Sequence, residues 1–290
     1  MNTLKQVKQN GTLYLAQDTP GWISQIIGED VQDCNTSMRY INQYFCRVQE
    51  ILGRDFETVT AVSQNEIDNK LIELIGESIP VVMDRYLLNQ FPCNRLEFSR
   101  YADGSKGPRP GADSIQDQLE FLTNALSNEN DVVLVDDGTF TGGSLQYATR
   151  ILEENGIKIS RSVCYFYNPA LKIESLQAFQ PLENMIDWID SRDLSIFGGR
   201  YRNLDSGITV TVPYMAPFSD GKSASLAGRN LFPEISRSLI ESQYLLFESL
   251  NLLDMNFAYL KGRGFVPPSC NTQTPSDDST VREYLQMLMM

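Results

Sequence analysis

The chain has 290 residues, a hydrophobic content of 42% and a formal net charge of −13. Such a length and composition are typical of a globular protein with a substantial core, and the chain has no run of about 18 apolar residues that could span a membrane. The acidic balance disfavours nucleic acid and anionic membranes as partners, and the absence of histidine excludes Ser-His-Asp triads and most transition-metal sites.

The N-terminal residues and the cysteines predict a cytoplasmic location. Residues 1–9 are polar and lack the apolar segment of a signal peptide. The cysteines are odd in number, scattered and without C-x-x-C spacing, so we expect a reducing, cytoplasmic environment and no zinc site. They are Cys34, Cys46, Cys93, Cys164 and Cys270.

The N-terminal part is predicted to be mainly irregular and helical. Residues 1–55 are expected to form irregular chain followed by an amphipathic helix at 37–52, which packs on the core or on a second subunit. Residues 56–62 then predict a strand. The turn 63–66 leads into a helix, where Ser63 and Glu66 have the spacing of a capping box.

A short strand at 96–99 is expected to run into a Gly/Pro-rich stretch at 100–111. This stretch carries three cations and one acid, which is typical of a mobile surface loop. Asp113-Ser114 is predicted to cap a following helix that carries Leu119, Leu122 and Leu126.

The segment 132–145 specifies the most chemistry. Four aliphatic residues predict a strand that is buried on both faces, Asp136 and Asp137 follow it, and a Gly/Thr-rich turn then leads into a helix that stops near Gly156. Backbone N–H groups converge at such a helix N-terminus and favour an anion, while the aspartates favour hydroxyl groups. The pattern therefore predicts a ribose 5-phosphate site, against the simpler alternative of a structural corner with a solvated aspartate pair. Like charges side by side disfavour that alternative.

Three better-known motifs fit this segment less well. A Walker A loop needs a lysine before the serine, but Ser144 follows Gly143 directly. A haloacid-dehalogenase-type phosphatase resembles the Asp137-Gly138-Thr139 run, but Val135 stands where its nucleophile would be. A dinucleotide-binding G-x-G-x-x-G pattern is not present in the loop.

The rest of the chain predicts more strands and a helical end. Strands are expected at 159–167 and 184–189, which together with the preceding elements give a β-α-β-α-β order. This order predicts a parallel sheet flanked by helices. Ligands are expected to bind at the carboxyl ends of its strands. A strand-like segment at 208–212 lies within the irregular stretch 193–227. A long helix is predicted at 233–255, a flexible Pro/Ser/Asp-rich linker at 267–280, and a short helix at the C-terminus.

The Asp-Asp-x-x-x-Thr-Gly-Gly-Ser run at 136–144 closely resembles the phosphoribosyl-diphosphate (PRPP) motif of the type I phosphoribosyltransferases. The resemblance implies an α/β fold with a parallel sheet flanked by helices, a core at 56–228 with a variable hood, and helical extensions at 1–55 and 229–290. It also implies that Asp136 and Asp137 hold the ribose hydroxyls. The residues that would wrap the 5′-phosphate are Phe140, Thr141, Gly142, Gly143 and Ser144. Some purine-specific members carry an aspartate where Phe140 stands, so the base specificity stays open.

The same resemblance suggests roles for the flanking segments. The stretch 100–111 corresponds to a loop that closes over the substrate, which makes Arg100, Lys106 and Arg109 candidate catalytic partners of pyrophosphate. The turn 63–66 is a second pyrophosphate candidate, with a plain helix cap as its alternative. Residues 193–227 are the candidate hood, in which Phe197, Tyr214 and Phe218 either stack on a base or simply pack.

Two functions remain open at this level. The first is a transferase that uses Mg²⁺ and PRPP. It moves the phosphoribosyl group to a nucleophilic nitrogen, expected to be that of an unidentified base, and releases pyrophosphate. The family resemblance also implies a homodimer, and the sequence alone assigns no residue as a ligand of the Mg²⁺ ion. The alternative is a non-catalytic or repurposed sensor or effector of PRPP or nucleotides, for example in a bacterial anti-phage (retron-type) defence system. A pure sensor has little need of a mobile loop that clamps pyrophosphate.

Overall fold

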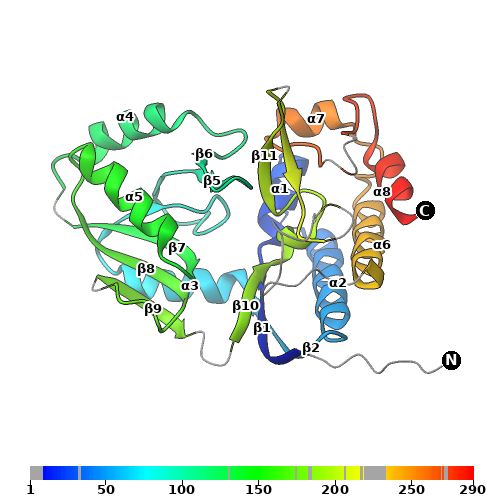
Figure 1. Ribbon diagram of the computed structural model, residues 1–290, viewed down its shortest axis with the longest axis horizontal. Coiled ribbons are helices and arrows are strands. Elements are labelled where there is room, and N and C mark those ends of the chain that lie inside the picture. The colour runs from blue at the N-terminus through cyan, green and yellow to red at the C-terminus, as the bar shows by residue number, and fades with distance from the viewer. Residues whose placement is uncertain are drawn as a thin grey trace. The chain divides into compact units, whose positions relative to one another are not determined.

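The computed structural model describes residues 9–31, 34–129, 131–173, 175–181, 185–205, 207–215, 218, 233–268, 270 and 274–290. The chain packs into two compact units. Unit 1 comprises residues 1–62, 101–103 and 184–290, and unit 2 comprises residues 63–100 and 104–183. Figure 1 shows the elements of both units. The described residues contain no helix long and apolar enough to cross a membrane.

Unit 2 contains a parallel sheet of five strands in the order β4-β3-β7-β8-β9. Its strands are β3 (Ile79–Val82), β4 (Asn94–Arg95), β7 (Val132–Thr139), β8 (Ile159–Tyr167) and β9 (Leu176–Pro181). The aliphatic run at the start of β7 is fully buried because both faces of the sheet are covered by helices. The expected parallel sheet flanked by helices is therefore confirmed.

Three helices cover this sheet. They are α3 (Gln64–Ile75), α4 (Ile115–Leu126) and α5 (Gly143–Glu154). The buried leucines of α4 and α5 form one core with Leu134 and other strand residues, whereas α3 lies on the opposite face (Figure 1). The predicted cap of α4 is confirmed, because Ser114 Oγ accepts a hydrogen bond from Asp117 N at 3.2 Å.

Residues 98–108 form a β-hairpin, whereas the composition of residues 100–111 predicts a mobile surface loop after a short strand at 96–99. Strand β5 (Phe98–Arg100) pairs antiparallel with β6 (Lys106–Pro108). Gly104 (φ +87°) lies in the turn, where its positive φ lets the chain reverse. The glycines and prolines that indicated a mobile loop thus make a short two-stranded element.

Unit 1 contains the three-stranded sheet β10-β1-β2 and the hairpin β11–β12. The strands are β1 (Gln9–Gln17), β2 (Phe56–Ser63), β10 (Met185–Asp190), β11 (Arg200–Asn203) and β12 (Thr209–Val212). The helices are α1 (Thr19–Ile27), α2 (Asn35–Leu52), α6 (Pro233–Ser249), α7 (Phe257–Gly262) and α8 (Val281–Met289), with a 3-10 turn η1 at Ser191–Leu194. Trp22, Phe197 and Phe247 pack together in its core, with ring centroids 5.7–6.4 Å apart.

Several expectations about unit 1 were wrong in detail. Residues 9–27 form β1 and α1 and not irregular chain, because β1 gains its hydrogen bonds from β10, about 170 positions away in sequence. The strands expected at 56–62 and 184–189 exist, but as β2 and β10 of this sheet and not of the sheet in unit 2. The predicted helix at 233–255 ends at Ser249, where the chain turns through Asn251 (φ 57°).

The predicted division into residues 1–55, 56–228 and 229–290 stays a prediction. In the expected linker 267–280, residues 269 and 271–273 lie outside the described part. Within the described part, the N–H groups of Phe257 and Ala258 at the start of α7 donate to the Ser279 and Asp277 carbonyls.

Candidate functional site

The candidate site lies where the strand order of unit 2 changes direction. From β3 the chain continues outward to β4 on one side, whereas β7, β8 and β9 follow on the other. Ligands of open α/β sheets bind outside the carboxyl ends of the strands at such a point, because the connections leave the two neighbouring strands on opposite faces. The carboxyl ends that meet here are those of β3 and β7, and Val82 is paired with Val135.

Asp136 and Asp137 lie within the carboxyl half of β7. The strand runs through both of them to Thr139, because β8 continues beside it and pairs Asp136 with Cys164. This corrects the expectation that the strand ends before the pair. The N–H of Gly138 donates to Asp137 Oδ1 at 2.7 Å, which fixes that carboxylate against the backbone.

Asp136 has an unusual ionisation. Burial raises its pKa well above the ordinary value of an aspartate, and the neighbouring charges of Asp137 and Asp84 raise it further. Burial and the same aspartate pair also raise the pKa of the Cys164 thiol. The free protein therefore holds a proton on Asp136 to a higher pH than an exposed aspartate would.

The loop 140–144 joins β7 to the N-terminus of α5. Gly142 adopts a left-handed conformation (φ 77°), and its N–H donates to Thr139 Oγ1 at 3.1 Å. The first helical hydrogen bond runs from Gln146 N to the Gly142 carbonyl, so the amides of Ser144 and Leu145 precede it. Amides at such a position point along the helix axis toward an incoming anion.

Phe140 and Gly142 of this loop differ in their surroundings. The Phe140 side chain is 48% exposed, whereas Thr139 beside it is buried. A Cβ atom at position 142 would lie 3.0 Å from Ile173 Cδ1, in addition to the unfavourable φ. Glycine is therefore favoured at this position mainly by its conformation, while the flexible end of the Ile173 side chain would have to shift slightly for a Cβ atom.

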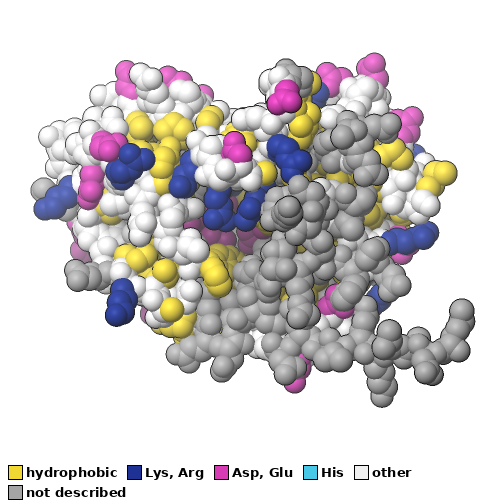
Figure 2. All heavy atoms as spheres, viewed as in Figure 1, with side chains coloured by type: hydrophobic (Ala, Val, Ile, Leu, Met, Phe, Trp, Pro, Cys, Tyr) yellow, Lys and Arg dark blue, Asp and Glu magenta, His cyan; other side chains and the backbone are white. Residues whose placement is uncertain are grey.

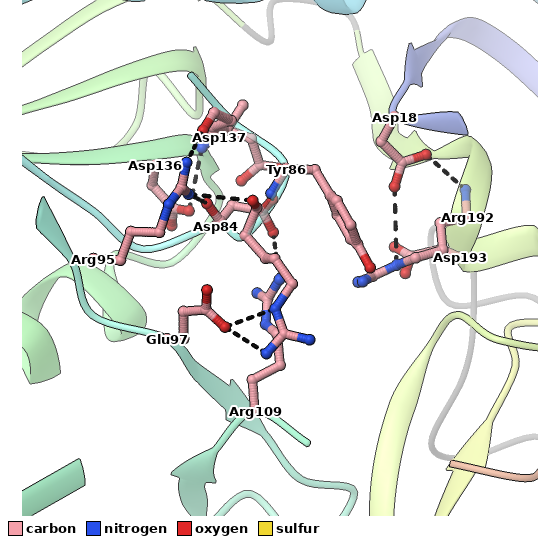
Figure 3. Close-up of polar contacts among 12 residues, drawn as sticks. Asp18, Asp84, Tyr86, Arg95, Glu97, Arg109, Asp136, Asp137, Arg192 and Asp193 are labelled. Atoms are coloured by element: carbon pink, nitrogen blue, oxygen red, sulfur yellow. Dashed lines mark hydrogen bonds and ion pairs between the residues drawn. The ribbon is translucent and has the colours of Figure 1, made fainter. Parts of the chain in front are cut away.

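Asp84 is a third carboxylate at this point of the sheet, and sequence reasoning missed it. It follows β3 directly, and its Oδ2 accepts a hydrogen bond from Arg109 Nη1 at 2.9 Å (Figure 3). Its Oδ1 accepts from the Tyr86 N–H at 2.7 Å. The apolar run Ile79–Met83 before it resembles the run before Asp136 and could have indicated the strand, but Pro80 disfavours a central strand.

Two arginines hold the segment that follows β3. The Arg95 guanidinium donates to the carbonyls of Asp84 and Leu87 at 2.8 and 2.9 Å. Arg85 donates to Glu97 Oε2 at 2.7 Å and to the Pro110 carbonyl at 3.1 Å. These bonds hold the backbone of this segment against β4 and the residues that follow β6.

The three cations predicted to contact pyrophosphate lie in different surroundings. Arg109 is buried and bonded to Asp84. The Lys106 ammonium lies 4.8 Å from the ring centroid of Tyr147 on α5, and Arg100 pairs with Lys106 across the hairpin. The structure thus brings Arg109 to the carboxylates and places Lys106 against α5. On the face drawn in Figure 2, Lys and Arg side chains are prominent on unit 2 despite the acidic net charge.

The turn 63–66 is a helix cap in this structure. Ser63 Oγ accepts from the Glu66 N–H at 3.2 Å, and the Glu66 carboxylate accepts from the Tyr165 hydroxyl at 2.7 Å. Because β2 belongs to the sheet of unit 1, the strand beside β7 is β3. The segment that follows β3, at the carboxyl end of the sheet beside Asp136 and Asp137, is therefore 83–90 and not the turn 63–66.

The hood residues of the described part pack within unit 1. Phe197 is buried in the aromatic core, Phe218 lies near Tyr284, and the Tyr214 hydroxyl accepts from Arg200 Nε at 3.1 Å. Residues 206, 216–217 and 219–227 of the predicted hood lie outside the described residues. For the described aromatics, packing is the interpretation that the contacts favour.

The carboxylates are compatible with a magnesium ion bound in part by substrate. Within the described ranges, no group of three or more Cys, Asp or Glu side chains could enclose a metal ion by itself. Mg²⁺ is commonly bound by one or two carboxylates together with substrate phosphates and water, and Asp136 and Asp137 could supply the carboxylates of such a site.

Two comparisons with known proteins found a match to this chain. Residues 97–191 match the family model of the phosphoribosyl transferase domain. A crystal structure of the purine phosphoribosyltransferase from Pyrococcus horikoshii Ot3 is similar over 44% of this chain and 86% of that chain, with 15% sequence identity and a TM-score of 0.30. A search of curated proteins found no match. Residues 97–191, which contain the β7–α5 segment and its aspartate pair, belong to the phosphoribosyl transferase domain family.

Proposed function

We propose that the protein transfers the 5-phosphoribosyl group of PRPP to a nitrogen nucleophile, such as that of a nucleobase, and releases pyrophosphate. The observation that carries the proposal is the Asp136–Ser144 segment, which runs from the carboxyl end of β7 into the N-terminus of α5 at the switch point of the sheet. The segment supports the proposal because carboxylates that can accept hydrogen bonds from sugar hydroxyls and helix amides that can bind a phosphate lie within one short stretch of chain.

Each part of the segment has a role in this proposal. Asp136 and Asp137 accept hydrogen bonds from the ribose hydroxyls, and their negative charge stabilises the positive charge that develops on the sugar as pyrophosphate leaves. The amides and hydroxyls of residues 140–144 hold the 5′-phosphate. A bound Mg²⁺ would supply charge neutralisation for the pyrophosphate oxygens, with Asp136 and Asp137 as the protein groups that fit it.

The cations of the hairpin region complete the proposed site. The candidates for contact with pyrophosphate are Arg100, Lys106 and Arg109. The chain has a net charge of −13, so an anionic substrate needs local positive charge, which these side chains would supply. Arg109 already lies beside the carboxylates through its bond to Asp84. For Lys106, contact with pyrophosphate requires that it leave the Tyr147 ring.

The experiment is pyrophosphate release from PRPP and Mg²⁺, measured with and without a pooled panel of purine and pyrimidine bases. Release that depends on a base supports the transferase, and division of the pool then identifies the acceptor. Release that is absent although PRPP binds contradicts a transferase acting on these bases. Failure of PRPP to bind at any pH removes the proposal altogether.

One observation favours a second function, a non-catalytic sensor of PRPP or a nucleotide. Lys106 and Arg109 both interact with groups of the protein itself, Tyr147 and Asp84, and the segment that carries Lys106 is a paired hairpin. A protein that binds the phosphoribosyl group without displacing pyrophosphate has no need to free these cations. PRPP binding without pyrophosphate release is the result that distinguishes the sensor.

A further inference from the structure

Asn168 follows β8 directly and lies beside the loop that joins β7 to α5. The two strands pair in parallel as far as Thr139 and Tyr167. The Asn168 N–H then donates to the Thr139 carbonyl at 3.0 Å, which extends the ladder by one bond. Pro169 comes next, and a residue before proline prefers an extended backbone. Asn168 is therefore fixed at the carboxyl edge of the sheet by its own main chain.

Both polar atoms of the Asn168 side chain are engaged. Its Oδ1 accepts from the Ala170 N–H at 3.0 Å, which makes an Asx turn around Pro169. Its Nδ2 donates to the Phe140 carbonyl at 3.2 Å. One atom accepts while the other donates, so an amide fits this position and a carboxylate, which has no donor, does not.

The bonds from Asn168 fix two consecutive peptide groups of the loop. The Thr139 carbonyl belongs to the same peptide group as the Phe140 N–H, and the Phe140 carbonyl to the same group as the Thr141 N–H. In a planar trans peptide the C=O and the N–H point in opposite directions. The Thr141 N–H is therefore turned away from Asn168, and its orientation is set by a residue that follows the neighbouring strand.

The Thr141 amide is available to a ligand. Thr141 is exposed, and its N–H has no hydrogen-bond partner among the residues that the structure describes. Its hydroxyl stays within the loop, where Oγ1 accepts from the Gly143 N–H at 3.5 Å. The amides of Ser144 and Leu145 precede the first hydrogen bond of α5. The loop thus presents amides at both of its ends.

We propose that Asn168 is a positioning residue of the 5′-phosphate site: it turns the Thr141 N–H toward the phosphate of a bound ribose 5-phosphate group and does not contact that phosphate itself. This inference rests on the proposed function, because it concerns the phosphate loop of the same site. Asn168 lies outside the 136–144 motif, and the family match to residues 97–191 assigns it no role.

Asn168→Ser tests this role with the turn preserved. A serine hydroxyl can accept from the Ala170 N–H in the same kind of turn, but the shorter side chain does not reach the Phe140 carbonyl. The Thr141 amide then loses its fixed orientation. The affinity for ribose 5-phosphate should fall about tenfold, because the weakened bond is one to a charged group. PRPP carries the same 5′-phosphate, so its affinity should fall by the same factor.

Asn155→Ala is the matched control. The Asn155 Nδ2 donates to the Ile151 carbonyl at 2.8 Å, so this variant also removes a bond from an amide side chain to a carbonyl, but at the C-terminus of α5. It should lose stability in urea unfolding, as Asn168→Ser does, and keep the wild-type affinity for both ligands. The dissociation constants are measured by isothermal titration calorimetry on the full chain with Mg²⁺ present.

The Thr141 amide resonance gives a readout that a loss of stability alone does not move. In the wild type its ¹H–¹⁵N signal should shift downfield when ribose 5-phosphate is added, because the amide donates to a charged oxygen. In Asn168→Ser this shift should shrink. In Asn155→Ala it should equal the wild-type shift.

The outcomes separate the inference from the proposed function. Weaker binding of both ligands and a smaller Thr141 shift in Asn168→Ser, with neither change in Asn155→Ala, support the positioning role. Unchanged affinity in Asn168→Ser, or weaker binding with an unchanged Thr141 shift, overturns it, although PRPP binding stands. If Asn168→Ser does not fold, a wild-type Thr141 amide that does not shift when ribose 5-phosphate binds overturns it. A wild-type protein that binds neither ligand overturns the proposed function and the inference with it.

Discussion

The Ser191 hydroxyl donates to Asp18 Oδ1 at 2.7 Å in the interior of unit 1, and this bond joins the carboxyl ends of β10 and β1. The Thr19 hydroxyl lies 2.6 Å from the same serine oxygen, and the Arg192 N–H also donates to Asp18 Oδ1, at 2.9 Å. The Tyr44 hydroxyl, close enough to be affected by the Asp18 charge, is buried and has no hydrogen-bond partner among the described residues. Asp18 is thus a buried acid held by hydroxyl and amide donors, with the Arg192 guanidinium Nε 3.9 Å from its Oδ2 atom.

Asp18 should make unit 1 less stable as the pH rises. Burial raises the pKa of Asp18 to about 7, against the opposing influence of the Arg192 charge and the Ser191 hydrogen bond. Between about pH 4 and 7 the folded state then holds a proton that the unfolded state has lost, so the free energy of unfolding falls as the pH rises through this window. The total change should be on the order of a few kcal/mol.

Asp18→Asn removes this titration and keeps an oxygen acceptor for Ser191 and Arg192. We expect the melting temperature of the wild type to fall more between pH 5 and 8 than that of the variant, as measured by differential scanning calorimetry. Asp254→Asn is the control, because Asp254 is an exposed acid whose pKa is lowered by Arg282. Equal pH dependence in the wild type and Asp18→Asn would contradict the assignment.

The double variant Asp136→Asn/Asp137→Asn should lose PRPP binding. Hydrogen bonds to charged groups contribute about 1.5–3 kcal/mol each, so the loss of both carboxylates should weaken binding by at least about a hundredfold. Isothermal titration calorimetry with Mg²⁺ present measures the effect. Glu153→Gln, an exposed acid on α5, controls for net charge, and an unchanged dissociation constant in the double variant would disprove a PRPP site at this aspartate pair.

Gly142→Ala should weaken binding of the 5′-phosphate group as well as the fold. A non-glycine residue at φ 77° costs about 1–2 kcal/mol, and the added Cβ must displace Ile173. The matched control is Gly156→Ala, at φ 82°, where a Cβ would meet nothing within 4 Å. In urea unfolding Gly142→Ala should lose at least as much stability as Gly156→Ala, whereas only Gly142→Ala should lose affinity for ribose 5-phosphate. Equal affinities in the two variants would count against the phosphate loop.

Lys106→Met tests the proposed contact with pyrophosphate. Removal of the cation from the Tyr147 ring should cost only about 0.5–1 kcal/mol of stability, because the contact is at the surface. If Lys106 contacts pyrophosphate, the variant should lose affinity for PRPP and keep its affinity for ribose 5-phosphate. Lys70→Met is the control, since Lys70 lies 4.9 Å over the Phe179 ring in the same unit. Identical PRPP affinities for the two variants would remove Lys106 from the site.

The sequence predicted the parts of the fold whose signals are local. The run 132–135, the glycine turn and the apolar spacing of α5 define β7, the loop and the helix within about 25 residues, and the Ser114 cap of α4 is equally local. β8 follows from its continuous apolar stretch. These elements also contain the residues proposed to bind the sugar and the phosphate. The candidate site could therefore be located from the sequence.

The missed parts depend on partners that are distant in sequence. β1 is polar in part and gains its hydrogen bonds from β10 and β2, which flank it in the sheet, whereas β3 is four residues long and contains Pro80. Local propensity therefore did not reveal either strand, and without β3 the position of Asp84 could not be known. The composition of 100–111 indicated a mobile loop, but antiparallel pairing of residues 98–100 with residues 106–108 makes a hairpin that carries Lys106.

A chain without histidine usually changes its charge little around neutral pH, but in this one burial raises the pKa of Asp18 to about 7, and Asp136 holds its proton to a higher pH than an exposed aspartate would. The folded protein is therefore less anionic than the formal count of its side chains. Any event that ionises these acids, whether unfolding or the arrival of a ribose, transfers protons to the surrounding buffer. The heat recorded for such an event then varies with the ionisation enthalpy of the buffer, so calorimetry in two buffers counts the protons released.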